Sequence, residues 1–361
     1  MSTPIKSVIN KFNVDTTNQP LFLGEGLSIQ RYDKFKYEIF FKLFREQLEF
    51  FWSPEEVSII KDRNDFKSMT ENEQFIFLSN LRFQTLLDSM IGRGINEILK
   101  YVSNPELEAC INIWNAFENI HSYSYTHIIK NVFADPTEIF DSILEDEEIV
   151  KRAHSVAETY DVLMNLDDAS EDELKQKLFE ALIATNILEG IRFYISFACA
   201  FFFGTQSKMT GNAAIIRLIA RDENLHVAIT QNIIKYLREV ESEGFSDIVA
   251  NSEELVISMF KKAAEEEKEW VDYLFSKGPI VGLTDRELKG YIEWLTNTRV
   301  RSLGYKTKIY DIKRNPIDGW LSKWYDSESV QSAPQEEEIT SYRKGSANTD
   351  INPDDFDGFD L

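Results

Sequence analysis

Two Glu-x-x-His motifs are the residues of this sequence best suited to chemistry. Glu118 and His121 form the first, and Glu223 and His226 form the second, in a chain with four histidines in all. Residues three apart share one face of an α-helix, and both motifs lie in stretches with helical apolar spacing. A buried carboxylate or imidazole is costly unless it is partnered. A metal ion removes that cost, because ionised oxygen and neutral imidazole nitrogen are the ligands that it needs.

Two further carboxylates lie on otherwise apolar helical faces. Asp88 follows Leu81 by seven residues in "LRFQTLLDSM", and Glu189 lies in "TNILEGIRFY". Four carboxylates would place a charge of about −4 in a dry interior, which two divalent ions would neutralise. Paired Glu-x-x-His helices with a carboxylate from each of two other helices are typical of di-metal carboxylate bundles. The predicted ligands are Asp88, Glu118, His121, Glu189, Glu223 and His226.

The main alternative for these carboxylates is a set of buried salt bridges, with Arg192 and Arg221 as partners. That alternative leaves the repeated spacing of the two motifs unexplained. The predicted ligand set contains oxygen and nitrogen but no sulfur, which suits iron or manganese better than structural zinc. The sequence therefore indicates a redox-active pair of metal ions.

Tyr125 stands one helical turn after His121, close enough to be oxidised by such a centre. At 100° per residue, Trp114, Glu118, His121 and Tyr125 fall within about 60° of one another. A core tyrosine with one hydrogen bond is the alternative interpretation of Tyr125, and the neighbouring metal set favours the functional one. Three residues one turn from ligands are expected to form a dry shell that protects a radical: Phe193, Phe197 and Ile219.

Helix start signals divide most of the chain into long helices. A capping side chain followed by a proline, or by a glutamate three residues later, marks a helix start. Such signals occur at Ser53, Thr70, Asn104, Asp135, Ser170, Asn251 and Thr284. We expect the helix from Asn104 to reach about residue 131, the one from Ser170 to reach about 203, and a further helix over 211–242. A break at Gly92 and Gly94 and a small hairpin over 315–324 are also expected.

The composition divides the chain into one helical domain and a tail. With 361 residues, 43% of them hydrophobic, the chain can bury a large core. From about Ser327 the sequence is acidic and poor in aliphatic residues, which is typical of a disordered segment. The sequence therefore predicts an all-α domain over residues 1–326 and a flexible tail over 327–361.

Charge and cysteine content exclude several classes of function. The net charge of −22 repels phosphate backbones and anionic lipid, so we expect neither nucleic-acid nor membrane binding. The apolar run 191–204 is too short to span a bilayer. Cys110 and Cys199 form no metal-type spacing and are expected to be reduced thiols. Together with an N-terminus that lacks an apolar signal region, this predicts a cytoplasmic protein.

Several long strings resemble the small, radical-generating β subunit of class I ribonucleotide reductase. They are "FFWSPEEV", "LRFQTLLDS", "ENIHSYSYTHIIKN", "LEGIRFYISFACAF", "IIRLIARDENLH", "NPIDGW" and "APQEEEITSY", and they cover nearly the whole chain. The resemblance implies a ferritin-like fold, a homodimer and an oxo-bridged diiron centre with two iron ions per chain. Related subclasses use manganese, which stays an alternative.

The resemblance also implies roles for individual residues. Tyr125 would carry a stable tyrosyl radical, made when the reduced metal site reacts with dioxygen. Trp52 and Asp222 would take part in proton-coupled electron transfer, and Tyr342 would relay the oxidising equivalent to the large subunit, which reduces ribonucleotides to deoxyribonucleotides. Glu56 is expected at the subunit interface. The extreme C-terminus, "DDFDGFDL", would dock on the large subunit.

Two other functional classes fit parts of the sequence. A ferritin that stores iron would share the ligand pattern, but such chains are usually about half this length and need neither the tail nor Tyr125. A di-metal oxidase or desaturase acting on acyl chains would need an apolar substrate channel, which the sequence does not test.

Overall fold

The fold was analysed in a computed structural model, which describes residues 9–10, 15–26, 29–166 and 168–325. The predicted tail, with Tyr342, lies outside these residues. The described residues form helices, and their only β pairings are two isolated bridges, Phe22 with Val102 and Ile280 with Leu283. The predicted all-α class is therefore confirmed.

The helices follow one another along the chain with short connections. In order they are η1 (Thr16–Asn18), α1 (Glu38–Glu49), η2 (Pro54–Glu56), α2 (Asp62–Ser68), α3 (Glu71–Leu99), α4 (Pro105–Val132), α5 (Pro136–Asp141), α6 (Glu147–Met164), α7 (Glu171–Ile187), η3 (Leu188–Arg192), α8 (Tyr194–Thr205), α9 (Thr210–Glu239), η4 (Glu241–Glu243), α10 (Ser246–Asn251), α11 (Glu253–Leu274), α12 (Asp285–Ser302) and α13 (Asp318–Tyr325).

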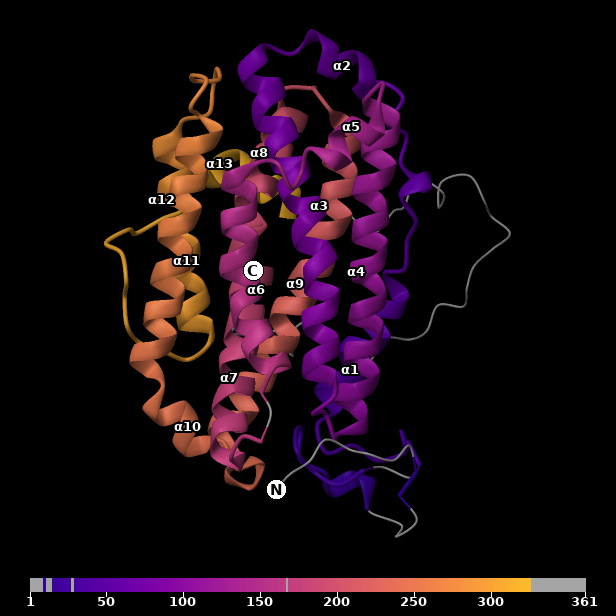
Figure 1. Cartoon of the computed structure of the whole chain (residues 1–361), viewed down its shortest axis with the longest axis vertical. Helices are drawn as coiled ribbons and strands as arrows, with labels where there is room; N and C mark the ends of the chain where they lie inside the picture. The colour runs from indigo at the N-terminus through magenta and orange to yellow at the C-terminus, as the bar shows by residue number, and fades with distance from the viewer. Residues whose placement is uncertain (1–8, 11–14, 27–28, 167, 326–361) are drawn as a thin grey trace.

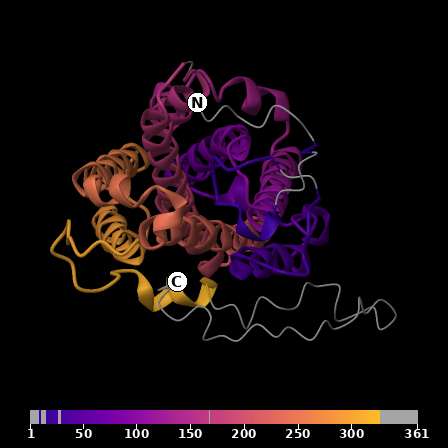
Figure 2. The same ribbon diagram turned by 90° about the horizontal axis from the view of Figure 1, so that it is seen from below.

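Long helices standing side by side make up the body of the molecule. Helices α3 and α4 pack along each other, α9 packs on α4, α7 and α8, and α1 covers α4 and α9 (Figure 1). Helices α11 and α12 pair with each other on one flank. Seen along the bundle, these helices surround a common interior (Figure 2). That interior is where inward-facing side chains of α3, α4, α7 to α8 and α9 can meet.

Most predicted helix starts are present, because their caps satisfy free backbone N–H groups. Thr70 and Thr284 form complete capping boxes with the glutamates three residues later. Asn104 and Ser170 accept hydrogen bonds from backbone N–H groups three residues ahead.

Two predicted starts differ. Ser53 makes no side-chain cap and precedes only the short 3₁₀ turn η2. The start predicted at Asn251 is wrong, because Asn251 is the last residue of α10 and α11 begins after Ser252 without a side-chain cap.

The break predicted at Gly92 and Gly94 is wrong, because α3 continues through both glycines. The two residues allow close packing. A Cβ atom at Gly94 would lie 2.7 Å from the ring of Tyr160 on α6, and one at Gly92 would lie 3.2 Å from Asn115 on α4. Glycine at these positions lets neighbouring helices approach, and the surrounding packing keeps α3 helical.

The hairpin predicted over 315–324 is also wrong, since the segment forms helix α13. Its aromatic side chains pack onto α8. The ring of Trp324 stacks on Phe201 with centroids 5.0 Å apart, and Arg217 on α9 donates to the Trp324 carbonyl at 3.1 Å. These tertiary contacts decide the conformation of a segment with weak local preference.

The apolar helix predicted over 171 to about 203 exists, but it is not uniform. Helix α7 passes through the π-helical turn η3 into α8, and the joined segment covers residues 171–205. By length and composition this joined helix could cross a membrane, and it is the one such helix among the described residues. The sequence had suggested an apolar run too short to do so. In this fold, 94% of its most apolar window is buried inside the protein.

Candidate metal centre

All six predicted ligand side chains meet in the interior of the bundle. Two groups of potential ligand atoms, each within 4.8 Å of one another, share Glu118. The first consists of Asp88, Glu118 and His121, and the second of Glu118, Glu189, Glu223 and His226. Each of these side chains is at most 2% exposed. We call these six residues the metal cluster. Such a buried cluster could hold a di-metal centre.

The π-helical turn gives Glu189 its place in this cluster. A π-turn adds one residue to a helical turn and so shifts the side chains that follow it, and such turns are frequent at functional sites. Arg299 on α12 donates from Nε to the carbonyl of Gly190 at 3.2 Å, which supports the widened turn from outside. Long helices position the other five cluster residues.

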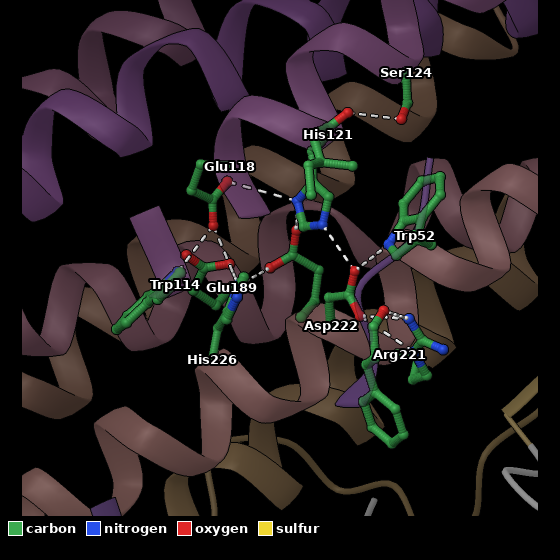
Figure 3. Close-up of polar contacts among 12 residues, drawn as sticks. Trp52, Trp114, Glu118, His121, Ser124, Glu189, Arg221, Asp222 and His226 are labelled. Atoms are coloured by element: carbon green, nitrogen blue, oxygen red, sulfur yellow. Dashed lines mark hydrogen bonds and ion pairs between the residues drawn. The ribbon is translucent and has the colours of Figure 1, made fainter. Parts of the chain in front are cut away.

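The imidazole of His121 is oriented by contacts on both sides. Its Nδ1 faces the cluster, 3.2 Å from Glu223 Oε1 and 3.6 Å from Glu118 Oε2 (Figure 3). Its Nε2 lies 3.2 Å from Asp222 Oδ2, outside the cluster. A carboxylate behind a ligating histidine fixes the ring and raises its basicity. The geometry therefore presents the Nδ1 lone pair to an ion between the carboxylates.

His226 faces the metal cluster from α9. Its Nδ1 lies 3.0 Å from Glu223 Oε2 and 3.2 Å from Glu118 Oε1. The ring stacks on Trp114, with centroids 4.8 Å apart, and the Trp114 indole donates to Glu118 Oε1 at 2.8 Å. The sequence placed Trp114 on the ligand face without giving it a role. Because Trp114 lies on the same helix face as Glu118, the sequence could have indicated that its indole positions this carboxylate.

The hydrogen-bonding capacity of the cluster is far from satisfied within the described residues. Both carboxylate oxygens of Asp88 and of Glu189 are buried without a hydrogen-bond partner, as are one oxygen of Glu118 and one of Glu223. Buried polar atoms in folded proteins are almost always partnered. Ligands of one ion stand about 2 Å from it and hence up to about 4 Å from each other, which suits this spacing. The residues present therefore fit a pair of bound cations.

The electrostatics of the cluster lead to the same conclusion. Burial, followed by the negative charge of Glu118, raises the pKa of the Asp88 carboxyl well above its usual value. Burial and the charge of Glu223 do the same for the pKa of Glu189. Without cations the cluster must take up protons to remain neutral, whereas divalent ions would replace those protons.

Tyr125 is fully buried beside the cluster. Its hydroxyl approaches Asp88 but reaches no hydrogen bond of normal geometry. Burial, and then the negative charge of Asp88, hold the pKa of this phenol well above its usual value. The side chain is therefore a neutral phenol whose polar group faces the cluster. Such a group can give up an electron only together with its proton.

A line of polar contacts leads from the cluster toward the surface. Asp222 Oδ2 accepts from the Trp52 indole at 2.7 Å and lies next to His121 Nε2 (Figure 3). Its Oδ1 accepts from Arg221, which also donates to the carbonyl of Phe50 at 2.8 Å. Trp52 itself is 3% exposed, while its neighbour Phe51 is 68% exposed. Trp52 therefore connects His121 with residues just beneath the surface.

The remaining predicted site residues are placed as follows. Phe193, Phe197 and Ile219 are fully buried, and the first two rings stack with centroids 5.8 Å apart. Glu56 is half-buried in η2, next to the Trp52 segment. Tyr342 lies outside the described residues.

Comparisons with known proteins point to one family. The family model described as "Ribonucleotide reductase, small chain" matches residues 30–316. The ribonucleoside-diphosphate reductase subunit beta of Buchnera aphidicola subsp. Baizongia pistaciae is 44% identical, over 97% of this chain and 99% of that protein. Subunit beta of ribonucleoside-diphosphate reductase 1 from Escherichia coli O157:H7 is 41% identical, over 96% and 97%. The solved structure "Ribonucleotide reductase R2 subunit from Clostridium botulinum" has a TM-score of 0.82 and 28% identity, covering 90% of this chain and 99% of that one.

Proposed function

The chain belongs to the family of class I ribonucleotide reductase small (β) subunits, and we propose that it generates a tyrosyl radical and passes the oxidising equivalent to the large subunit. Because the chain belongs to this family, the two alternative functions, a ferritin and an acyl-chain oxidase, are set aside. Subunits of this family work with a large subunit and are generally dimeric. The proposal concerns the chemistry that this chain contributes to the joint reaction.

The single observation that carries the proposal is an oxidisable phenol beside a metal cluster that also contacts a buried indole. Tyr125 lies next to Asp88 of the cluster. His121 of the same cluster contacts Asp222, which accepts a hydrogen bond from Trp52. A protein that only stored iron would need neither the buried phenol nor the buried indole. A radical generator needs both, because it must make an oxidised residue and also deliver that oxidation elsewhere.

The cluster residues Asp88, Glu118, His121, Glu189, Glu223 and His226 would hold two iron ions per chain. Iron held there would supply, with dioxygen, the oxidising power for a one-electron oxidation of Tyr125. The phenol must lose its proton in the same event, since burial makes a charged phenol cation costly. Asp88, the carboxylate that the Tyr125 hydroxyl approaches, is the proton acceptor that we propose.

We propose that a dry shell keeps the oxidised phenol from being quenched. Its predicted members, Phe193, Phe197 and Ile219, are fully buried and carry no group that donates a hydrogen atom as readily as a phenol or thiol. The carboxylate of Asp222 fixes the indole of Trp52 and the imidazole of His121. Through that arrangement an electron can move from Trp52 toward the cluster while a proton shifts along the Asp222 bridge. Tyr342 would then connect Trp52 to the large subunit.

The choice of iron rests on chemistry and on the presence of Tyr125. An oxygen and nitrogen ligand set suits iron and manganese alike. A phenol placed to be oxidised favours the tyrosyl-radical, diiron type. Dimanganese stays the alternative, and metal analysis of protein purified from its native source would distinguish the two.

Electron paramagnetic resonance tests the central claim. Metal-free protein loaded with ferrous iron and exposed to oxygen should give an organic radical signal. Tyr125→Phe should abolish the signal while iron binding stays at two ions per chain. Tyr160→Phe is the matched control, because Tyr160 is another buried phenol, bonded to Thr185. The same spectrum from wild type and Tyr125→Phe would contradict the assignment.

The partner surface is proposed to be the C-terminal tail. Its last residues combine acidic groups with Phe356, Phe359 and Leu361, which suits a segment that orders in a groove of the large subunit. Protein lacking residues 350–361 should keep its radical and lose reductase activity in the presence of the large subunit. Normal binding of the large subunit by the truncated protein would refute this. We further propose a cytoplasmic homodimer, testable by analytical ultracentrifugation.

A further inference from the structure

A cavity of about 220 Å³ is lined by Arg299, whose side chain also donates to the carbonyl of Gly190 in η3. It lies between α12, α13 and the beginning of α8, and the residues that matter for its chemistry are Tyr194, Asn224, Arg299, Asn315, Asp318 and Tyr325. Its size is below that of sites for drug-sized ligands and suits a small molecule. Trp294 and Leu321 supply apolar parts of the wall.

Arg299 is the dominant group in this cavity. Its side chain is 2% exposed, and its hydrogen bonds within the described residues go to a carbonyl and a hydroxyl, not to a carboxylate. Two of its nitrogens are used, Nε toward the Gly190 carbonyl and Nη2 toward the Tyr194 hydroxyl at 2.8 Å. Its Nη1 makes no hydrogen bond to the described part of the chain. A buried charge that is not directly paired with a carboxylate is costly, so this guanidinium favours a bound anion.

Two asparagines add hydrogen-bond donors to the same cavity. Asn224 uses its Oδ1 to accept from Tyr194 at 2.7 Å, and Asn315 uses its Oδ1 to accept from the backbone N–H of Ile317 at 3.1 Å. The NH₂ groups of both amides, which can only donate, have no acceptor among the described residues. The hydroxyl of Tyr325 is also buried, next to the hydroxyl of Tyr291, which lines the same cavity. The cavity therefore gathers one cation and several free donors.

We propose that this cavity binds a small oxyanion, a carboxylate or a phosphate, on Arg299 and the amides of Asn224 and Asn315. A guanidinium binds such groups in a planar, two-point manner that adjacent amide donors can extend. Asp318 lines the rim of the cavity, and its negative charge weakens the binding of an anion. The proposal stands apart from the radical chemistry and does not depend on it.

The site is built into the same elements as the metal cluster. Arg299 holds the carbonyl of Gly190, the residue after Glu189, and Asn224 directly follows Glu223. An anion bound to Arg299 therefore contacts the outer side of the π-helical turn whose inner side presents a proposed ligand. Arg299 is therefore in contact with both the cavity and the segment that carries Glu189.

Calorimetric titration of the metal-loaded, full-length chain with inorganic phosphate, and separately with acetate, tests the proposal at constant ionic strength. Saturable binding of one anion per chain is expected for at least one probe, and the tighter probe identifies the chemical class. Neither probe binding at millimolar concentration would overturn the proposal.

Variants distinguish the cavity from the metal ions as the place of binding. Asn315→Ala should weaken binding about tenfold, the worth of one charge-assisted hydrogen bond. Arg299→Gln should abolish binding, and Asp318→Asn should strengthen it about threefold. Lys306→Gln, which removes an exposed positive charge near the end of α12, is the matched control and should change nothing. Phosphate binding that is unchanged in folded Asn315→Ala protein would show that the anion binds elsewhere, and would refute the site.

Discussion

The molecule buries charged side chains in two neighbouring places, and the two are built in opposite ways. The metal cluster gathers carboxylates of one sign with two imidazoles and leaves many of their atoms without partners. The second place, which we call the ion-pair cluster, consists of Arg152, Arg192, Glu266 and Glu267 on α6, η3 and α11. It matches two cations with two anions from the chain itself.

The charges of the ion-pair cluster cancel, although Arg152 Nε, Arg152 Nη1 and Glu267 Oε2 have no hydrogen-bond partner among the described residues. Arg192 lies 2.5 Å from Glu266 and 3.5 Å from Glu267, and Arg152 pairs with Glu267. The guanidinium of Arg152 also lies over the rings of Phe83 and Trp270, with its central carbon 3.7 and 4.4 Å from their centroids. Such an arrangement holds helices together and has no need of a ligand.

This comparison decides a question that the sequence left open. Buried salt bridges with Arg192 and Arg221 were the alternative explanation for the predicted ligand carboxylates. In the structure Arg192 belongs to the ion-pair cluster, and Arg221 bonds Asp222, which lies behind His121. Neither arginine pairs with a predicted ligand among the described residues. A buried group of like charges without internal compensation is the feature that indicates bound cations.

The largest expected effect is on metal-dependent stability. Saturating the cluster with ions at about a thousandfold their Kd should raise the free energy of unfolding by about 4 kcal/mol per ion. Glu189→Gln should lose most of this gain. Without metal the variant should be as stable as wild type or more so, because burial and Glu223 already favour the neutral carboxyl of Glu189 by raising its pKa. Calorimetry with and without iron measures both quantities, and a metal-free variant destabilised by several kcal/mol would contradict this reading.

The ion-pair cluster should respond in the opposite way. Glu267→Gln leaves two buried guanidinium groups with one carboxylate, so the free energy of unfolding should fall by about 3–5 kcal/mol. The loss should be equal with and without metal, because no predicted ligand changes. Denaturant unfolding of both forms gives the comparison. A loss seen only in the metal-loaded form would mean that the two clusters are not independent.

Glu46 offers an intermediate case, a half-buried carboxyl near Arg221 with one oxygen unpartnered. Burial and the charge of Glu49 raise the pKa of Glu46 to about 7, against the opposing effect of Arg221. The folded form then holds a proton that the unfolded chain releases near pH 4.5, so stability falls as pH rises from 4.5 to 7. In Glu46→Gln the fall in the free energy of unfolding should be about 2 kcal/mol smaller than in wild type. Comparing the free energies of unfolding of the two proteins at pH 8 and at pH 4.5 measures this difference.

The smallest effect is expected at the exposed edge of the ion-pair cluster. Lys151 and Glu269 lie 2.9 Å apart, with side chains 62% and 60% exposed. Exposed pairs of this kind contribute little, so Glu269→Gln should change the free energy of unfolding by less than about 0.5 kcal/mol. Thermal unfolding at low and at high salt should give nearly the same difference. A larger effect would mean that the negative charge of Glu269 also stabilises the buried arginines.

The sequence predicts the placement of side chains best where spacing has a direct geometric meaning. The interval in Glu-x-x-His places two side chains on one helix face, and helix caps follow local backbone chemistry, as at Thr70 and Thr284. The errors occurred where distant contacts override local preference. Gly94 packs against Tyr160, and Trp324 packs against Phe201.

The amino-acid sequence by itself determined the helical class, the faces that carry the carboxylates and imidazoles, and the family to which the chain belongs. Tertiary structure alone decided that the imidazole of His121 turns one nitrogen to the cluster and the other to Asp222, and that Arg192 serves a separate set of ion pairs. It also decided that Arg299 is buried without a carboxylate partner among the described residues. The physical reason is that periodicity along a helix fixes direction around its own axis. Which groups meet, and whether their charges cancel, depends on how several helices pack together.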